Sequence, residues 1–383
     1  MNIAYLTTSL PDDVFNLLVS ASPIKPNPAG QNFHAKAIRS LALAGAHIDV
    51  YSMIPIPGYV ESNEIVFSEN LTYHLMNRYT SRLKNKISLV SHIVKAIEST
   101  WDKIPDILLY DSLNLTLSTV AMRLKKAHKL PVVAFLTDDP VNLSSTSDFY
   151  QKQVIKVSQN ADGYIALTEG LVRRFHSSEI PSLRLLGFVD PVKRYNRPVS
   201  QPYDYYGGAL FEKDISMALL YAYSKAKPRT ELFIAGHGPL DTTIKTFARS
   251  NPRIHFLGQI PKETHYTYVQ NANITWNPRT YRKSLDEVSV PSKVLEYLAY
   301  SPCIVSSYSQ SIDEEFHSNI NWLSKKELTG SPDIEEFFKN HLNEQGDWKD
   351  LIPNQAQEKI LRELGPLCSG EKMLSFLQGL LSR

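Results

Sequence analysis

Short apolar runs alternate with amphipathic segments along most of the 383-residue chain, and this alternation limits the fold more than any other feature. In the first half, we expect buried strands at 2–8, 47–53, 106–112, 131–138, 163–168 and 183–188. Segments with helical periodicity lie between them, for example over 32–45 and 87–100. Strands that alternate with helices are typical of βαβ units, so the pattern predicts a parallel sheet with both faces covered.

A second series of the same kind follows in the second half of the chain. Its expected strands are 205–210, 231–238, 253–260, 272–278, 303–308 and 320–324. The segment 194–206 between the two series is rich in Pro and Tyr and therefore predicts a linker. Four aromatic side chains of this segment fit either stacking on a ligand or packing of the linker itself: Tyr195, Tyr203, Tyr205 and Tyr206.

Two such series predict an α/β chain with two doubly wound Rossmann-like domains that face a cleft. We expect the first domain to span 1–193 and the second 194–362, with 363–383 forming a final helix that can pack back on the first domain. Ligands of doubly wound sheets bind beyond the carboxyl ends of the strands, so we expect the site there. The polar segment 340–356 is expected to form loops.

Composition excludes several classes of protein. The formal net charge is +2 and both halves are close to neutral, which argues against a nucleic-acid partner. The two cysteines, Cys303 and Cys368, cannot form a disulfide framework and favour a reducing compartment. The opening MNIAYLTTSL lacks a basic region before its apolar residues, so we expect no signal peptide, and no apolar run is long enough to span a bilayer. A cytoplasmic protein is therefore expected.

The stretch SVPSKVLEYLAYSPCIVSS (289–307) places charged residues at the start of an apolar helix. Pro291 suits the first turn, where its missing N–H costs no hydrogen bond. The free amides and the positive dipole end of such a turn attract phosphate, and Lys293 adds a charge there. Glu296, one turn later, could accept hydrogen bonds from a ribose diol. A surface ion pair between Lys293 and Glu296 fits the residues equally well.

Two glycine-containing turns follow predicted strands. GGALFEK (207–213) contains Gly208 and, five residues later, Lys213. The glycine allows a phosphate to approach the backbone closely, and the lysine could neutralise the phosphate charge. IAGHGPL (234–240) contains Gly236, His237 and Gly238, which suit contact with a base or a ribose edge. Taken alone, each turn also fits an ordinary strand-to-helix connection.

Six motifs of the second half resemble, in order and spacing, the donor-binding domain of nucleotide-sugar glycosyltransferases of the B fold, and most of all glycosyltransferase family 4. These motifs are GALFEK, AGHGP, HFLG, NANITWNP, PSKVLEYLA and PCIVSS. The resemblance is strong over 200–325. It is looser in the first half, where 28–52 is similar to the glycine loop, first helix and second strand of the family.

The resemblance implies roles for individual residues. Glu296 would hold the ribose hydroxyls, while Lys213 and the amides around Ser292 and Lys293 would hold the diphosphate. Gly30 would let the first loop approach the sugar phosphate. The remaining residues that the resemblance places in the nucleotide-sugar site are Gly208, Gly236, His237, Gly238 and Arg279. Lys213, Glu296 and Asp138 are the expected catalytic residues.

The sequence also departs from the family pattern. Ala209 stands where the family has an arginine, so a phosphate contact is absent or comes from Arg279, Arg282 or Lys283. Val288 stands where the family has its first glutamate, and Asp286 and Glu287 lie nearby but out of register.

In the first half, the family often has a His-Asp pair after the strand VVAFL. Thr137 replaces this histidine and precedes Asp138 and Asp139. Because of this replacement, the resemblance gives weaker support for an acceptor site like that of the family in this turn.

The implied function is transfer of a sugar, most simply a hexose, from a nucleotide diphosphate sugar to a carbohydrate, glycolipid or protein-linked acceptor, with retention of configuration. This activity is typical of polysaccharide biosynthesis and uses the nucleotide sugar as co-substrate, with no other cofactor. Lysines and helix amides can stabilise the leaving diphosphate, and no acidic or Cys/His cluster with metal-ligand spacing is evident, so we expect no metal requirement.

Three alternatives remain open at this stage. One is a nucleotide-sugar epimerase of the same fold, which would need no acceptor. Another is a catalytically silent subunit that stabilises a partner enzyme, which the departures at Ala209, Val288 and Thr137 favour. The third, a non-catalytic carbohydrate-binding module, is disfavoured by the phosphate-suited turns. The sequence does not specify the sugar, the base, the acceptor, the linkage or the oligomeric state.

Basic residues cluster at 82–86 and 123–129, near apolar residues of the segment 87–93. Such a patch can contact a membrane surface, which suits an enzyme with a lipid-linked glycan acceptor on the inner face of a membrane. A solvated basic helix face explains the same residues and agrees better with the near-zero charge of this half.

Overall fold

The computed structural model describes residues 1–21, 28–56, 64–142, 146–176, 179–281, 286–326 and 331–382. The chain divides into two compact units. Unit 1 comprises Met1–Phe188 and Leu364–Arg383, and unit 2 comprises Val189–Glu363. The final helix thus belongs to the unit formed by the first half of the chain.

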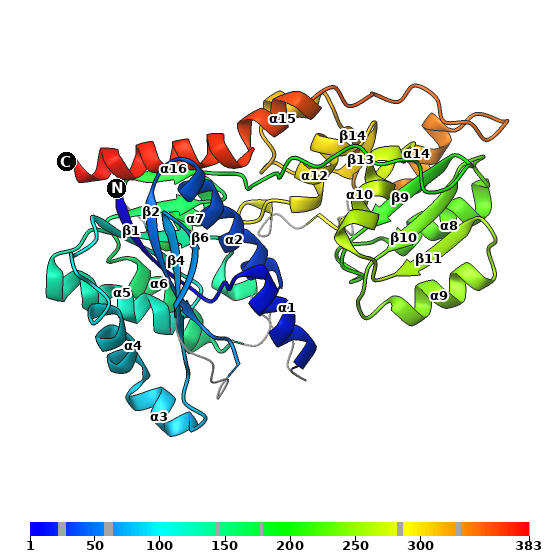
Figure 1. Cartoon of the computed structure of the whole chain (residues 1–383). Helices are drawn as coiled ribbons and strands as arrows, with labels where there is room; N and C mark the ends of the chain where they lie inside the picture. The colour runs from blue at the N-terminus through cyan, green and yellow to red at the C-terminus, as the bar shows by residue number, and fades with distance from the viewer. Residues whose placement is uncertain are drawn as a thin grey trace. The chain divides into compact units, whose positions relative to one another are not determined.

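Unit 1 is an alternation of strands and helices (Figure 1). Its strands are β1 (Asn2–Thr7), β2 (His47–Met53), β3 (Glu64–Ser68), β4 (Leu71–Met76), β5 (Ile107–Asp111), β6 (Val132–Leu136), β7 (Gly163–Ala166) and β8 (Ser182–Arg184). Its helices are α1 (Asp12–Ala21), α2 (Pro28–Leu43), α3 (Arg82–Ile87), α4 (Leu89–Glu98), α5 (Leu115–His128), the 3-10 turn η1 (Pro140–Asn142), α6 (Asp148–Ser158), α7 (Glu169–Phe175) and α16 (Pro366–Leu381).

The sheet of unit 1 has the order β3-β4-β2-β1-β5-β6-β7-β8, and every pair except β3–β4 is parallel. Its central strands β1, β5 and β6 are apolar and buried along almost their whole length, as expected for a sheet covered on both faces. On one face, Met373 and Leu377 of α16 join the core beside α2. The two helices approach closely because Gly370 has no side chain: a Cβ there would lie 1.9 Å from the Ser40 carbonyl oxygen.

Two details of unit 1 differ from the sequence-based prediction. The antiparallel β3–β4 hairpin was not predicted, although a short apolar run (65–67) and the alternating sequence LTYHLM (71–76) flank the short Glu69–Asn70 turn. The last strand is shorter than predicted and ends at Arg184. Leu185, Leu186 and Phe188 are buried as irregular chain, so their apolar run indicates burial and not strand.

Unit 2 repeats the alternation of strand and helix. Its strands are β9 (Tyr203–Gly207), β10 (Glu231–Ala235), β11 (Ile254–Gly258), β12 (Thr275–Asn277), β13 (Ile304–Ser307) and β14 (Asn321–Leu323). Its helices are α8 (Met217–Ala226), α9 (Asp241–Arg249), α10 (Lys262–Asn271), α12 (Ser292–Tyr300), α13 (Glu314–His317), α14 (Ile334–His341) and α15 (Gln357–Glu363). All six strands are parallel, in the order β11-β10-β9-β12-β13-β14.

The predicted linker is wrong at its carboxyl end. Strand β9 begins at Tyr203, and Tyr203, Tyr205 and Tyr206 are completely buried in the core of unit 2. These tyrosines are therefore strand residues, and β-strands favour such aromatic side chains. Only 194–202 runs as irregular chain.

The mainly irregular segment after α14 is anchored by a buried carboxylate at the start of β9. Asp204 Oδ2 accepts hydrogen bonds from Trp348 Nε1 at 2.8 Å and from Thr230 Oγ1 at 2.5 Å, and also from the Tyr223 hydroxyl. Burial raises the pKa of Asp204 to about 6. The Trp348 ring packs edge-on against Phe338, so this polar segment contributes an aromatic residue to the core.

Among the described residues, no helix is both long enough and apolar enough to cross a lipid bilayer.

Candidate functional site

The strand order of unit 2 has one switch point, between β9 and β12. The chain moves outward from β9 through β10 to β11, then returns to place β12 on the other side of β9. Connections on the two sides of such a point diverge, which leaves a crevice at the carboxyl ends of the two strands. The residues that follow Gly207 and Asn277 therefore occupy the position where a doubly wound sheet binds its ligand.

The turns after β9 and β10 pack backbone against backbone, and glycine makes this approach feasible. A Cβ on Gly236 would lie 1.8 Å from the Gly208 carbonyl oxygen, and one on Gly238 would lie 2.6 Å from that of Leu210. Gly208 and Gly236 also have φ angles of 153° and 149°, which side-chain-bearing residues rarely adopt. Leu210 N–H donates to the His237 carbonyl oxygen at 3.1 Å.

Lys293, at the start of α12, extends over this glycine turn. A Cβ on Gly208 would lie 1.9 Å from Lys293 Cε and 2.4 Å from Nζ. The ammonium donates to the Tyr206 hydroxyl at 2.8 Å and lies 4.6 Å from the centre of the Tyr206 ring. The pKa of Lys293 is lowered to about 8, mainly by burial and in part by Arg279, while Asp214 and Glu296 oppose the shift.

Helix α12 presents one buried and one polar face. Val294, Leu295 and Leu298 are almost completely buried, as the apolar periodicity predicts. On the other face, the side chain of Glu296 is 31% exposed and its Oε2 lies 3.5 Å from His265 Nε2. The N-cap residue is Pro291, and no side chain of the described residues caps this end. The amides of the first turn are thus suited to an anion.

Lys213 lies in the connection between β9 and α8, with its side chain exposed. Its carbonyl oxygen accepts a hydrogen bond from Thr280 N–H at 3.1 Å, which ties the loops that follow β9 and β12 together. Lys213 and the neighbouring Arg279 are therefore held on the two sides of the switch point. The side chain of Lys213 lies beside Phe211, with Nζ 5.9 Å from the ring centre.

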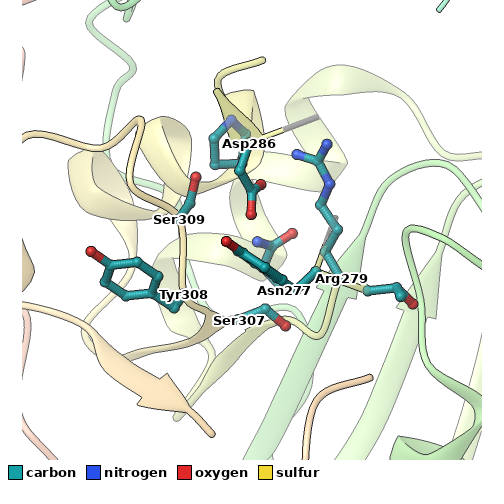
Figure 2. A pocket seen from close by; sticks show the side chains of 9 residues that line it. Asn277, Arg279, Asp286, Ser307, Tyr308 and Ser309 are labelled. Atoms are coloured by element: carbon teal, nitrogen blue, oxygen red, sulfur yellow. The ribbon is translucent and has the colours of Figure 1, made fainter. Parts of the chain in front are cut away.

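A small cavity lies at the carboxyl ends of β12 and β13 (Figure 2). Its volume of about 10 Å³ suits a single water-sized group. Asp286 points into it beside Asn277 and Ser309. Three of the described residues that line this cavity have a buried polar atom without a hydrogen-bond partner: Arg279 (Nε), Asp286 (Oδ2) and Ser307 (Oγ). Burial raises the pKa of Asp286 to about 6, although Arg279 opposes the shift.

His237 is the most exposed of the predicted residues in the β10 turn, with 75% of its side chain accessible. Asp241, the first residue of α9, accepts from Gly238 N–H at 2.7 Å and lies 2.5 Å from His237 Nδ1. One carboxylate thus fixes the ring and the turn together. The arrangement presents the imidazole to solvent without a role in the core.

The structure brings together the predicted residues of unit 2 at the β9–β12 switch point and its adjoining turns: Gly208, Lys213, Gly236, His237, Gly238, Arg279, Ser292, Lys293 and Glu296. Arg282 and Lys283, the other predicted sources of a phosphate contact, lie outside the described residues.

Gly30 and Asp138 belong to unit 1. Gly30 lies in the first turn of α2, and a Cβ there would meet no atom within 4 Å. Asp138 follows β6, and its Oδ1 accepts from Asp139 N–H and from Asn142 Nδ2 at 2.8 and 2.7 Å. Asp139 pairs with Arg174 at 2.9 Å, so the two carboxylates of this turn have different environments.

Sequence reasoning missed one histidine in each unit. In unit 1, His34 Nδ1 lies 2.8 Å from the Tyr5 hydroxyl, and its Nε2 lies 3.6 Å from Asp111 Oδ2. In unit 2, His265 of α10 contacts both Tyr205 and Glu296. His265 belongs to none of the six motifs, and no local spacing marks it as a neighbour of Glu296.

The sequence matches no protein-family model, and no curated protein matches it in sequence. Solved structures do match over the full length. Sucrose-phosphate synthase from Thermosynechococcus elongatus is 14% identical with a TM-score of 0.58, and the match covers 100% of this chain and 95% of that one. HepE of Anabaena, in complex with UDP and glucose, is 10% identical with a TM-score of 0.63, covering 99% and 100%.

A third similar structure is an α,α-trehalose-phosphate synthase (UDP-forming) from Burkholderia xenovorans in complex with glucose-6-phosphate. It is 10% identical with a TM-score of 0.64, and the match covers 98% of this chain and 100% of that one. At these identities the likeness concerns the fold, and it agrees with the two parallel sheets described above. The chain therefore has the glycosyltransferase B fold, built from two doubly wound α/β units.

Proposed function

We propose that this chain is a glycosyltransferase that moves a sugar, most simply a hexose, from a nucleotide diphosphate sugar to a carbohydrate, glycolipid or protein-linked acceptor with retention of configuration. Unit 2 binds the donor and unit 1 provides the acceptor side. The similarity to UDP-bound HepE supports a nucleotide sugar as donor. The motifs that resemble glycosyltransferase family 4 support retention and a place in polysaccharide biosynthesis.

One observation carries the proposal: the partly buried Lys293 places its ammonium over Gly208 at the amino end of α12. Desolvation of this charge is costly, as its lowered pKa indicates, so a purely structural role would favour an uncharged residue. An anionic ligand would compensate this cost. Glu296 lies one turn further along the same helix, where it could accept hydrogen bonds from a ribose attached to that diphosphate.

In this proposal, departure of the diphosphate is assisted by fixed positive groups. Lys213, Lys293, Arg279 and the first amides of α12 stabilise the charge that develops when the sugar–phosphate bond breaks. Because these groups are already in place, the reaction needs no divalent metal. Attack of the acceptor on the same face of the sugar preserves the configuration.

On the acceptor side, Gly30 lets the first loop approach the sugar phosphate, and Asp138 takes part in catalysis. The carboxylate of Asp138 is oriented by two hydrogen bonds, as a group that must act in one position requires. A lipid-linked acceptor would bring the enzyme to the inner, cytoplasmic face of a membrane. Leu83 and Ile87 of α3 are exposed, and so is Lys84 between them, which supports a peripheral contact.

A thermal-unfolding panel tests the donor assignment. UDP, ADP, GDP and TDP and the corresponding glucose conjugates are added to the protein, with uridine as the control that lacks phosphate. A ligand present at about 100 times its Kd stabilises the folded state by about 2.7 kcal/mol, which raises Tm by roughly 5–10 °C for a domain of this size. We expect at least one diphosphate to do so, equally with and without EDTA.

Two outcomes contradict this account. If no nucleotide changes Tm, the silent-subunit alternative takes the place of the donor-binding proposal. If binding or transfer is lost in EDTA and restored by Mn²⁺ or Mg²⁺, the fixed cations are not sufficient and the metal-independent mechanism is wrong.

The pKa of Lys293 predicts how binding depends on pH. Its folded-state pKa of about 8 lies below the usual value because of burial, so the ammonium loses its proton as the pH rises through 8. At pH 9 about a tenth of the free protein keeps the charge, and UDP affinity should fall roughly five- to tenfold between pH 7 and pH 9. Calorimetry on Lys293→Met should give weaker binding and a flat profile. A wild-type profile that stays flat to pH 9.5 would exclude a contact between Lys293 and the diphosphate.

A further inference from the structure

Three side chains from three different elements of unit 2 form a chain of contacts that ends at Glu296. The Tyr205 hydroxyl of β9 lies 2.9 Å from His265 Nδ1, and His265 Nε2 on α10 lies 3.5 Å from Glu296 Oε2 on α12. Tyr205 is completely buried, and 18% of the His265 side chain is exposed. These contacts thus connect the core of the sheet with the polar face of α12.

The chemistry of the two end groups fixes the direction of these contacts. A carboxylate only accepts hydrogen bonds, so Nε2 must carry the proton that faces Glu296. In the neutral ring, Nδ1 is then an acceptor, and the Tyr205 hydroxyl must donate to it. Burial raises the pKa of Tyr205 well above its usual value, so this hydroxyl remains a donor over the working pH range.

The turn after β9 leaves room for this arrangement. A Cβ on Gly207 would lie 2.6 Å from His265 Nδ1 and Cε1, and 2.7 Å from the Tyr205 hydroxyl. Gly207 has no positive φ angle, so space and not backbone conformation demands glycine here. A side chain at this position would push His265 away from Tyr205 and Glu296.

Tyr205, the partner of His265, is itself held by an aromatic contact. Tyr205 stacks on Tyr268 of the same helix α10, with ring centres 5.3 Å apart and an interplanar angle of 15°. Helix α10 packs against both β9 and α12. The ring nitrogen that faces Glu296 is therefore held by packing as well as by the Tyr205 hydroxyl.

We propose that His265 is a positioning residue that holds the Glu296 carboxylate in the orientation needed to accept hydrogen bonds from a ribose 2′,3′-diol. This inference rests on the proposed function, and it specifies the ligand as a ribonucleotide. His265 contacts Glu296 and not the ligand, so its loss should weaken recognition of the diol and leave recognition of phosphate unchanged. A histidine that only packs α10 against β9 would lack this selectivity.

Two amide substitutions of His265 distinguish its contact with Glu296 from its contact with Tyr205. In His265→Gln, the amide can occupy the position of Nε2 and still donate to Glu296. In His265→Asn, the shorter side chain can reach only the position of Nδ1, beside Tyr205. Calorimetric titrations with UDP and 2′,3′-dideoxy-UDP, and with the ADP and GDP pairs in parallel, then measure the affinity that depends on the diol.

We expect His265→Asn to weaken UDP binding about five- to tenfold with no change for the dideoxy analogue, and His265→Gln to bind UDP within about twofold of the wild type. His255→Asn is the matched control, because it removes another histidine–glutamate pair of unit 2, with Glu231 at 2.8 Å. It should change neither affinity. Thermal unfolding checks that all variants are folded.

Equal losses for UDP and its dideoxy analogue in His265→Asn, or no loss for either, would overturn the positioning role while the proposed function stands. The failure of His265→Gln to rescue binding would do the same. If the wild type binds none of the ribonucleoside diphosphates, the proposed function itself fails, and this inference fails with it.

Discussion

Alanine in place of Gly236 is expected to destabilise unit 2 by about 3 kcal/mol or more and to remove nucleotide binding. The added Cβ would lie 1.8 Å from the Gly208 carbonyl oxygen and 2.9 Å from the carbonyl carbon. Both are backbone atoms, so no rotamer change relieves the overlap. The φ angle of 149° adds strain of its own. The two turns must separate, and Gly208 then moves relative to Lys293.

Urea unfolding at constant pH measures this effect, and Gly258→Ala provides the control. Gly258 also has a positive φ, of 65°, but a Cβ there would meet no atom within 4 Å. Its replacement should cost only about 1–2 kcal/mol, the cost of the left-handed conformation. Similar losses for Gly236→Ala and Gly258→Ala would mean that the close approach of the two turns contributes nothing beyond backbone strain.

Local sequence patterns predicted those parts of the candidate site whose contacting residues are close in sequence or belong to a spaced motif. The apolar runs placed β9 to β14 near their observed positions, and glycine pairs after β9 and β10 marked the two turns. Pro291 and Lys293 marked the start of α12. These features follow from strand and helix periodicity and from backbone geometry, which act over a few residues.

Contacts between distant segments could not be predicted in this way. His265 meets Glu296 only because α10 and α12 pack together, and Asp204 meets Trp348 across 144 positions of sequence. The segment 194–206 predicts a linker because it is rich in Pro and Tyr, and the predicted strand starts only at Tyr205. Burial in the sheet instead places Tyr203 and Asp204 in β9 as well. Local patterns in a single sequence do not show which distant segments pack together.

Glu296→Gln is expected to weaken binding of a nucleoside diphosphate roughly tenfold to a hundredfold. The amide keeps the shape of the side chain but loses the charge that strengthens hydrogen bonds from the ribose hydroxyls. A hydrogen bond to a charged group contributes about 1.5–3 kcal/mol, which corresponds to this range. The variant should remain folded, because this side chain is 31% exposed. Glu231→Gln is the matched control, because Glu231 lies at the amino end of β10, whereas the candidate site lies beyond the carboxyl ends of the strands.

Lys213→Ala tests the other end of the same ligand. The lysine is exposed and its contact with Thr280 is made by the backbone, so its truncation should leave the fold intact. Because the side chain contributes charge only where phosphate lies, affinity should fall for UDP and stay unchanged for uridine. Lys225→Ala, in the last turn of α8, removes an exposed lysine away from the site and should have no effect.

Donor binding at α12 and the β9 turn is tested most sharply by a calorimetric titration of UDP, ADP and GDP into the wild type, Glu296→Gln and Lys213→Ala under identical conditions. We expect at least one diphosphate to bind the wild type. Glu296→Gln should bind it at least about tenfold more weakly, and Lys213→Ala should lose the preference for the diphosphate over its nucleoside. Equal binding by all three proteins would contradict donor binding there, since Glu296 and Lys213 would then be only parts of a helix surface and a turn.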